Sequence, residues 1–202
     1  MNSNGADNSA AKAALRVAMS GRRTASDPDV IKAVSERAAS NITALPEFKG
    51  AKTILVYLAL PQEVQTDRII ECAWQAGIQV AVPAARLDGE YVPVWLKPGD
   101  AVALARFRVP EPVVQVLAKP DRFDLVIVPG VAFTAEGARL GHGKGFYDRM
   151  LARLGRRARC KMGICFQFQL VPAMPVSDRD VGMDGVVTED RVYRSAVIVR
   201  NV

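Results

Sequence analysis

Residues 124–151, DLVIVPGVAFTAEGARLGHGKGFYDRML, decide the fold. The stretch begins with a continuous apolar run at residues 125–128, which Pro129 and Gly130 end, and this is the pattern of a buried strand. A polar loop with glycine at positions 137, 141, 143 and 145 follows, and residues 146–154 predict a helix. Glycine lets the backbone approach an anion closely, and a helix N-terminus directs free N–H groups towards it. A strand, a glycine loop and a helix in this order therefore predict a phosphate-binding arrangement.

Charged side chains accompany the glycine loop. Lys144 lies inside it, Arg139 comes two residues before Gly141, and Asp148 falls in the first helical turn, where a carboxylate can hold Mg²⁺ beside a phosphate. The loop matches neither common phosphate motif, because a P-loop needs Ser or Thr after the lysine and the dinucleotide motif needs glycine at position 146. In the alternative interpretation the glycines only form turns, Lys144 is solvated and Asp148 favours the helix dipole. The combination of alternate glycines with all three charges favours an anion site.

Length and composition indicate a globular chain. It has 202 residues, of which 50% are hydrophobic, so one domain with a sizeable core is expected and a disordered chain is excluded. No apolar run reaches the ~18 residues of a membrane span, and the polar start lacks the apolar segment of a signal peptide. We expect a flexible lead-in at residues 1–10, a single α/β domain at residues 11–202, and a cytoplasmic monomer without membrane contact.

Cysteine and histidine usage narrows the chemistry. Cys72, Cys160 and Cys165 are odd in number and unpatterned, which argues against a disulfide framework. Cys160 and Cys165 flank or lie in a predicted strand, so buried thiols are favoured over metal ligands at these two positions. His142 is the single histidine, which excludes a zinc site built from several histidines and a Ser-His-Asp triad elsewhere in the chain.

The net charge of +6 comes from 27 basic and 21 acidic residues, and a basic cluster occupies residues 153–161. A nucleic-acid surface is one interpretation of such a cluster. However, no aromatic residues interleave with it, and acidic residues are spread along much of the chain. We therefore expect a solvated helix end and no nucleic-acid partner, and an anionic small-molecule partner fits the charge equally well.

Helices are predicted at residues 10–22, from Ser26-Asp27-Pro28 onwards with an apolar face up to residue 42, and at residues 66–76 with Thr66 as the cap. Lys12 and Arg16 fall on one face of the first helix at i, i+4. They are either a solvated basic face or two cations that reach a shared anion, and the sequence leaves both interpretations open.

Strands are predicted at residues 53–59, 78–82, 91–96, 125–128, 161–166 and 185–188, with a further candidate at 196–199 and an extended segment at 107–112. Strands and helices alternate, and most strands are continuous apolar runs. This predicts a single three-layer α/β domain whose mostly parallel sheet is covered by helices on both faces. Ligands bind beyond the carboxyl ends of strands in such sheets, where the loops at residues 61–65, 130–145 and 172–184 fall.

These motifs resemble the 5-formyltetrahydrofolate cyclo-ligases, also called methenyltetrahydrofolate synthetases. VPGVAF followed by RLGHGKGFYDR is similar to the family signature R-L-G-x-G-x-G-[YF]-Y-D. Lys12 and Arg16 match a K-x-x-x-R pattern in the first helix, and Glu63 in PQEVQT, the segment FRVPEP and Asp180 in RDVGMDGVVTE match in order. The likeness runs from about residue 12 to about residue 189.

The resemblance implies ATP-dependent closure of 5-formyltetrahydrofolate to 5,10-methenyltetrahydrofolate with release of ADP and phosphate. It implies catalytic roles for Lys144, Arg139 and Glu63, and Mg²⁺ ligation by Asp148 and Asp180. The residues that it places against ATP are Lys12, Arg16, Arg139, Leu140, Gly141, His142, Gly143, Lys144, Gly145, Phe146 and Tyr147. Those that it places against the folate are Leu58, Glu63, His142, Gly143, Lys144, Gly145 and Phe146.

This chemistry explains why such residue types are needed. A formamide carbon is a poor electrophile, and phosphorylating its oxygen creates a leaving group that N10 of the folate can displace. The phosphoryl group in transfer needs cations and backbone donors around its oxygens, which Lys144, Arg139 and the glycine loop would supply. Glu63 would position the pterin or formyl group, unless it is only a surface charge of its loop.

Two positions depart from the family pattern. Phe146 stands where many members have Tyr, so a hydroxyl contact is lost, and Arg179 stands where bacterial members often have His. The alternative function is a non-catalytic sensor of a phosphorylated metabolite on the same fold. Lys144 combined with Asp148 and Asp180 favours the enzyme, because a binding protein does not require the second carboxylate. A sensor would release no ADP.

Overall fold

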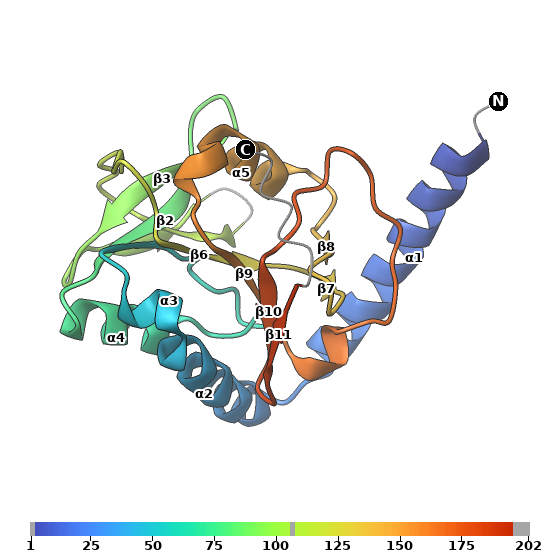
Figure 1. Ribbon diagram of the computed structural model, residues 1–202, viewed down its shortest axis with the longest axis horizontal. Helices are drawn as coiled ribbons and strands as arrows, with labels where there is room; N and C mark the ends of the chain where they lie inside the picture. The colour runs from blue at the N-terminus through green and yellow to red at the C-terminus, as the bar shows by residue number, and fades with distance from the viewer. Residues whose placement is uncertain (1–2, 106–107, 196–202) are drawn as a thin grey trace.

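The computed structural model describes residues 3–105 and 108–195, and Figure 1 shows one domain built on a central sheet. The helices are α1 Ser3–Thr24, α2 Pro28–Ala44, α3 Pro46–Lys49, α4 Asp67–Gln75 and α5 Phe146–Leu154, with 3₁₀ turns at Gly155–Arg157 and Gln167–Gln169. The strands are β1 Thr53–Leu55, β2 Gln79–Ala85, β3 Tyr91–Leu96, β4 Val102–Leu104, β5 Pro110–Pro112, β6 Leu125–Pro129, β7 Ala132–Phe133, β8 Arg139–Leu140, β9 Lys161–Ile164, β10 Gly185–Val187 and β11 Val192–Arg194.

Seven strands form the main sheet in the order β11-β10-β9-β6-β1-β2-β3. The five inner strands pair in parallel, and the edge strands β3 and β11 are antiparallel to their neighbours. The prediction of a mostly parallel sheet is therefore confirmed. Apart from Thr53, Gln79 and Lys161 at their first positions, the inner strands are apolar, as expected for a sheet covered on both faces.

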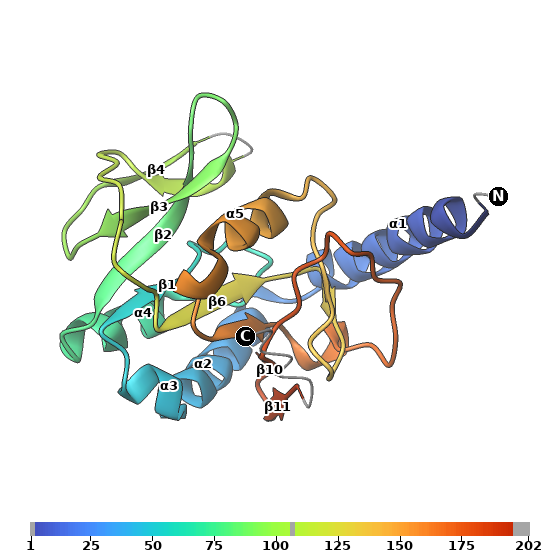
Figure 2. The ribbon, with the colours of Figure 1, turned by 45° about the horizontal axis from the view of Figure 1, so that its top comes forward.

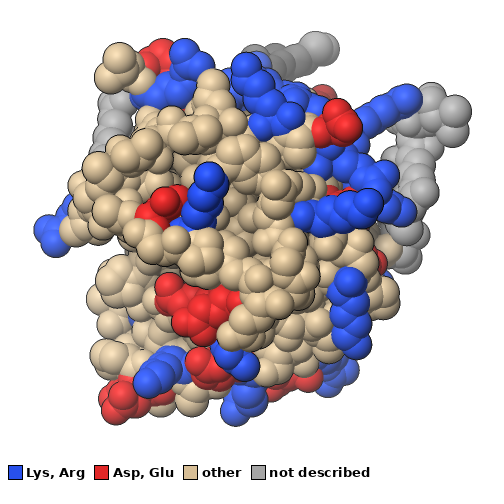
Figure 3. All heavy atoms as spheres, turned by 90° about the vertical axis from the view of Figure 1, so that its left-hand side faces the viewer, with Lys and Arg blue, Asp and Glu red and all other residues tan. Residues whose placement is uncertain are grey.

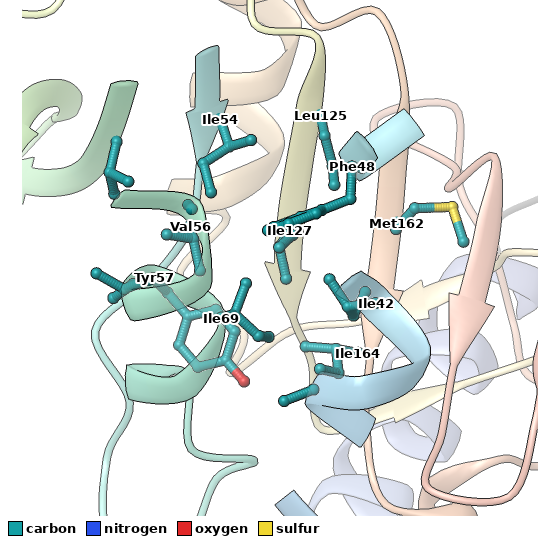
Figure 4. Packing of buried hydrophobic residues seen from close by; sticks show 14 of the residues in the cluster. Ile42, Phe48, Ile54, Val56, Tyr57, Ile69, Leu125, Ile127, Met162 and Ile164 are labelled. Atoms are coloured by element: carbon teal, nitrogen blue, oxygen red, sulfur yellow. The ribbon is translucent and has the colours of Figure 1, made fainter. Parts of the chain in front are cut away.

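Alternate side chains of the inner strands enter two separate cores. Ile54 and Ile127 pack with α2, α3 and α4 on one face, as Figure 4 shows, whereas Leu55, Val126 and Val128 pack with α5 on the other. Figures 1 and 2 place α2 and α4 on the opposite side of the sheet from α5. The predicted three-layer architecture follows from this alternation, since successive strand residues point to opposite faces.

Helix α1 begins at Ser3, so it already runs through most of the segment expected to be a flexible lead-in. Its N-terminal half projects away from the body of the domain in Figures 1 and 2. The C-terminal half is attached, with Leu15 and Met19 packed against Val131, Ala132 and Leu140. The part of α1 that follows Lys12 therefore lies against the β7–β8 hairpin.

Two predictions around β1 are wrong in detail. The strand ends at Leu55 rather than at residue 59, because the chain bends into the following loop. There the Tyr57 hydroxyl donates to the Val64 carbonyl at 2.7 Å, and the Thr66 hydroxyl donates to the Tyr57 carbonyl at 2.7 Å. Thr66 therefore occupies the N-cap position of α4 without capping it, whereas Asp27 does cap α2, by accepting from the Asp29 amide.

Strand β2 passes through Pro83 to Ala85, although proline was expected to end it. Pro83 lies opposite Pro93 of β3, and the Pro93 carbonyl accepts from the Ala118 amide at 2.9 Å on the far side. In an antiparallel pair of this kind the backbone polar groups point away from the partner strand. Neither missing N–H is needed between the strands, so both prolines are tolerated.

Several short elements were not predicted from the sequence. The hairpins β4–β5 and β7–β8 and the edge strand β11 consist of strands of two or three residues paired with a nearby segment, and runs this short carry no periodic signal. Within the segment predicted to be extended, Arg108 has a φ of 59° and only residues from Pro110 form a strand, while Phe107 lies outside the described residues. The candidate strand at residues 196–199 also lies outside them.

The cysteines are free thiols in the described chain, with Cys160 and Cys165 buried as expected and Cys72 half-buried. Burial raises the pKa of the Cys160 thiol to about 11 and the pKa of Cys165 further still. None of the helices described is long and apolar enough to cross a membrane.

Candidate functional site

A cavity of about 440 Å³ opens beyond the carboxyl ends of β1 and β6. All the residues predicted for the site line it, together with Tyr57, Leu60, Pro83, Tyr91, Val109 and Pro129. The three loops predicted to gather at this edge of the sheet therefore do so. The volume lies in the range of roughly 300–1,000 Å³ that is typical of small-molecule sites.

The glycine loop forms one wall of the cavity and leads directly into α5. Gly143 and Gly145 have φ values of 97° and 64°, which residues with a Cβ rarely adopt. Gly145 is the N-cap of α5, so no side chain caps the first helical amides, and residues 145–148 line the cavity. This end of the helix consequently presents backbone N–H donors and the positive end of its dipole to the cavity.

Arg139 is buried and paired, whereas the sequence suggested a cation directed at a phosphate. Its Nη2 donates to Asp148 Oδ1 at 2.7 Å and its Nη1 to the Pro129 carbonyl at 3.3 Å, with only 3% of the side chain exposed. The Val181 amide donates to the same Asp148 oxygen at 3.3 Å. The pair therefore ties the start of α5 to β6 and to the loop that carries Asp180.

Helix α1 supplies two cations to the cavity. Lys12 Nζ lies 2.6 Å from Asp180 Oδ2, and Arg16 Nε donates to the Gly141 carbonyl at 2.9 Å. Both side chains therefore lie at the site, which favours the interpretation of two cations that reach a shared anion over that of a solvated basic face. Burial opposes ionisation of Asp180, but hydrogen bonds from Lys12 and Ser177 outweigh it, so the pKa of this carboxyl lies below its usual value.

Glu63 also lines the cavity and is only 9% exposed. Its Oε2 accepts from the Leu60 amide at 3.1 Å, while Oε1 lies 3.5 Å from Arg23 Nη2 and 3.6 Å from His142 Nε2. Burial, followed by the charge of Glu63, raises the pKa values of Tyr57 and Tyr147 well above their ordinary value. Both phenols are therefore neutral at physiological pH.

The whole site lies within a region that matches known proteins. The model of the 5-formyltetrahydrofolate cyclo-ligase family matches residues 8–189. The chain belongs to this family. Escherichia coli 5-formyltetrahydrofolate cyclo-ligase is 31% identical over 176 residues, covering 85% of this chain and 97% of that protein. The mouse 5-formyltetrahydrofolate cyclo-ligase is 28% identical over 160 residues, covering 74% of this chain and 79% of the mouse protein.

Solved structures of cyclo-ligase relatives share the fold. The 5,10-methenyltetrahydrofolate synthetase of Aquifex aeolicus superposes with a TM-score of 0.77 at 30% identity and covers 92% of this chain and 93% of its own. The synthetase of Mycoplasma pneumoniae superposes with a TM-score of 0.71 at 24% identity, covering 88% of this chain and 98% of its own. At that lower identity the likeness concerns the fold alone.

The two departures from the cyclo-ligase pattern have different surroundings. Phe146 lines the cavity, its ring centre 5.1 Å from that of Tyr91 and 5.3 Å from the Arg149 guanidinium. Arg179 is exposed and is not among the described residues that line the cavity.

Two cavity neighbours were missed by sequence reasoning. Arg23 follows Arg16 by seven residues on α1, and this spacing returns to the same helix face, so a signal for it was present. Tyr91 comes from the antiparallel edge strand β3, and no local pattern indicates that it faces the glycine loop.

Asp148 and Asp180 suit a metal ion that is also bound by a phosphate better than one whose ligands all come from the protein. The described hydrogen bonds occupy Asp148 Oδ1 and Asp180 Oδ2. The described residues also contain no group of three or more His, Cys, Asp or Glu that could hold a metal. Mg²⁺ is commonly bound by one or two carboxylates with water and substrate phosphates, so the donor set fits this ion.

Proposed function

We propose that this protein catalyses the ATP- and Mg²⁺-dependent conversion of 5-formyltetrahydrofolate to 5,10-methenyltetrahydrofolate, releasing ADP and phosphate. One observation supports it above all: a single cavity is lined both by an anion-binding wall and by apolar and aromatic side chains. The anion-binding wall consists of the α5 N-terminus with Lys144, Lys12 and Arg16, and the apolar and aromatic side chains are those of Leu58, Tyr91 and Phe146, with Glu63 in the same cavity. Family membership supports the same reaction.

The anion-binding wall suits the phosphates of ATP. Lys12 and Arg16 approach from α1, Lys144 lies in the loop, and the first amides of α5 line the same space. Preorganised cations and amides of this kind stabilise the charge of a phosphoryl group in transfer. Arg139 acts differently from the expectation, since its contacts support a role in holding Asp148 and the loop rather than in contacting the phosphoryl group.

The apolar and aromatic part of the lining suits the folate. Glu63 accepts hydrogen bonds and shares the cavity with Leu58, Tyr91 and Phe146, a combination that matches a flat heteroaromatic ring with N–H donors. In the proposed reaction the formyl oxygen bonds to the γ-phosphorus as the bond to ADP breaks. The N10 lone pair then attacks the formyl carbon, the C–O bond breaks, and phosphate leaves. Holding the three reacting centres in one cavity removes the entropic cost of separate encounters.

Asp148 and Asp180 would hold Mg²⁺ at the phosphate side of the cavity. Bound there, the ion supplies charge neutralisation for the triphosphate. Lys12 and Arg139 already pair with these two carboxylates, so both are positioned by the protein alone.

The direct test mixes the protein with Mg-ATP and 5-formyltetrahydrofolate and follows the methenyl chromophore together with ADP. We expect both products in equal amounts, and neither without ATP. Folate or ATP binding without ADP release would instead support the sensor alternative. Lack of both binding and product would reject the proposal.

We further propose that the protein acts as a cytoplasmic monomer of one domain without nucleic acid. Within the basic cluster at residues 153–161, Arg153 pairs with Glu90 and Lys161 pairs with Asp184, which supports the last point. On the face drawn in Figure 3, acidic side chains lie among the basic ones. Light scattering at working concentration and a salt-dependent nucleic-acid binding assay test these two points.

A further inference from the structure

Arg23, in the last turn of α1, is a cation buried beside the cavity. It is 5% exposed, and a buried charge is costly unless partners compensate it. Its Nε donates to the Gln62 carbonyl at 3.1 Å, and its Nη2 lies 3.5 Å from Glu63 Oε1. Nη1 is buried and has no hydrogen-bond partner in the described chain. The two contacts of Arg23 are thus both with the short loop that carries Glu63.

Glu63 needs such a contact to hold one orientation. It belongs to no helix or strand, and only one of its oxygens is fixed by the loop itself, through the Leu60 amide. The other oxygen faces Arg23 on one side and His142 of the glycine loop on the other. The His142 side chain is 57% exposed, whereas the Arg23 side chain is 6% exposed, so Arg23 is the more rigidly held of the two partners.

We propose that Arg23 is the positioning residue for Glu63, which it holds as a fixed acceptor for the N–H donors of the folate ring. The proposal rests on the function proposed above. Arg23 itself is not among the described residues that line the cavity, so it acts through Glu63 rather than on the substrate. The guanidinium forks across Gln62 and Glu63, which a lysine cannot reproduce because it lacks the planar pair of donors.

The loop backbone has supports that do not involve Arg23. The Glu63 amide donates to the Leu60 carbonyl at 2.9 Å, and Gln65 Nε2 donates to the carbonyls of both residues. The Gln65 amide in turn donates to Ser35 of α2 at 2.9 Å. Loss of Arg23 should therefore free the carboxylate while the turn stays formed.

The experiment compares Arg23→Met with Arg22→Met, a matched loss of charge one residue away. Arg22 is exposed, stacks on Phe168 and lies away from Glu63. We expect Arg23→Met to raise the KM for 5-formyltetrahydrofolate roughly 10- to 100-fold, the scale typical of a lost supporting partner, with the KM for ATP nearly unchanged. Arg23→Lys should recover part of the loss, and Arg22→Met should resemble the wild type.

A role confined to anchoring α1 gives a different result. Lys12 and Arg16 lie on the same helix, so a displaced helix would raise the KM for ATP as well, and that outcome would overturn the proposal. In the Glu63→Gln background, Arg23→Met should add little further loss, whereas fully additive effects would also overturn it. If Arg23→Met does not fold, Arg23→Lys carries the same comparison.

Failure of the proposed function can be distinguished from failure of the Arg23 proposal, because in the former case the wild-type protein itself forms no methenyl product. Calorimetric binding of 5-formyltetrahydrofolate then still compares Arg23→Met with Arg22→Met, and equal affinities would reject the role of Arg23 alone.

Discussion

Individual side chains in the cavity differ in how firmly the fold holds them. Arg139 is fixed by Asp148 and Pro129, whereas Lys144 lies exposed at the tip of the glycine loop. Its ammonium lies 6.0 Å from the ring centre of Phe146. The long side chain of a lysine can follow the charge of a group that moves during transfer. Lys144 is therefore the side chain whose removal should affect turnover most directly.

Lys144→Ala is expected to lower turnover by roughly 10²- to 10³-fold, the scale for loss of one donor to the transition state. Thermal unfolding should barely change, because the side chain is exposed. The measurement is the steady-state rate of methenyl product, with the exposed Lys119→Ala as the control for charge. A turnover within about twofold of the control would contradict the role.

Asp148→Asn is expected to raise the Mg²⁺ concentration for half-maximal rate roughly tenfold or more, because a neutral amide is a poor ligand for this ion. Asp67→Asn is the matched control, since Asp67 also lies in the first turn of a helix but outside the cavity. An Mg²⁺ titration of both variants separates ligation from the helix dipole. An unchanged midpoint in Asp148→Asn would remove this residue as a ligand.

Two elements meet at the proposed phosphate site, and their junction is tightly packed. A Cβ on Gly143 would lie 3.3–3.6 Å from the guanidinium of Arg16, which itself donates to the Gly141 carbonyl. The loop therefore needs glycine both for its positive φ and for the approach of α1. The Asp180 loop docks in a similar way, since a Cβ on Gly137 would collide with the Met183 carbonyl oxygen.

Gly143→Ala should strain the loop and displace Arg16, so we expect the KM for ATP to rise by roughly an order of magnitude. Gly155→Ala provides the matched control, because its φ of 50° is also positive but nothing lies within 4 Å of the added Cβ. Both variants should lose roughly 1–3 kcal/mol of stability, because a residue with a Cβ rarely adopts a positive φ. Equal KM values for ATP in the two variants would show that the loop tolerates the side chain.

At the scale of the whole molecule, the sheet places the site and buried polar links hold the strands in register. Asp124, just before β6, accepts from the amides of Lys52 and Thr53 at 2.8 and 3.2 Å and from Arg122 at 2.8 Å. Burial works against ionisation of Asp124, but these hydrogen bonds outweigh it, so its pKa lies below the usual value. A carboxyl of this kind stabilises the fold at neutral pH and loses that contribution in acid.

Asp124→Asn should therefore lower the free energy of unfolding by about 1–3 kcal/mol at pH 7. The folded-state pKa is depressed, so the contribution is complete above the unfolded pKa of about 3.9 and is lost as the pH falls below it. The difference between variant and wild type should accordingly shrink at pH 3. Urea unfolding at both pH values measures it, with the exposed Asp121→Asn as control. A difference that does not depend on pH would contradict the assignment.

Much of the fold was predictable because its signals are local. The apolar runs gave β1, β2, β6, β9 and β10, and the Asp27-Pro28 start of α2 was recognised from its cap. The errors occur where a tertiary contact overrides a local preference. Thr66 bonds Tyr57 instead of capping α4, and β2 continues through Pro83 because no neighbouring strand needs its amide.

The sequence by itself determined the glycine loop, the helix that follows it and the alternation of strands and helices, because φ preferences and apolar periodicity act over a few neighbouring residues. Only the tertiary structure decided which partner each charged group takes. Lys12 meets Asp180 across 168 positions of the chain, Arg139 pairs with Asp148 in the lining of the cavity, and Arg23 reaches Glu63. Such pairs depend on how loops from separate strands converge at one edge of the sheet, and no local pattern encodes that convergence.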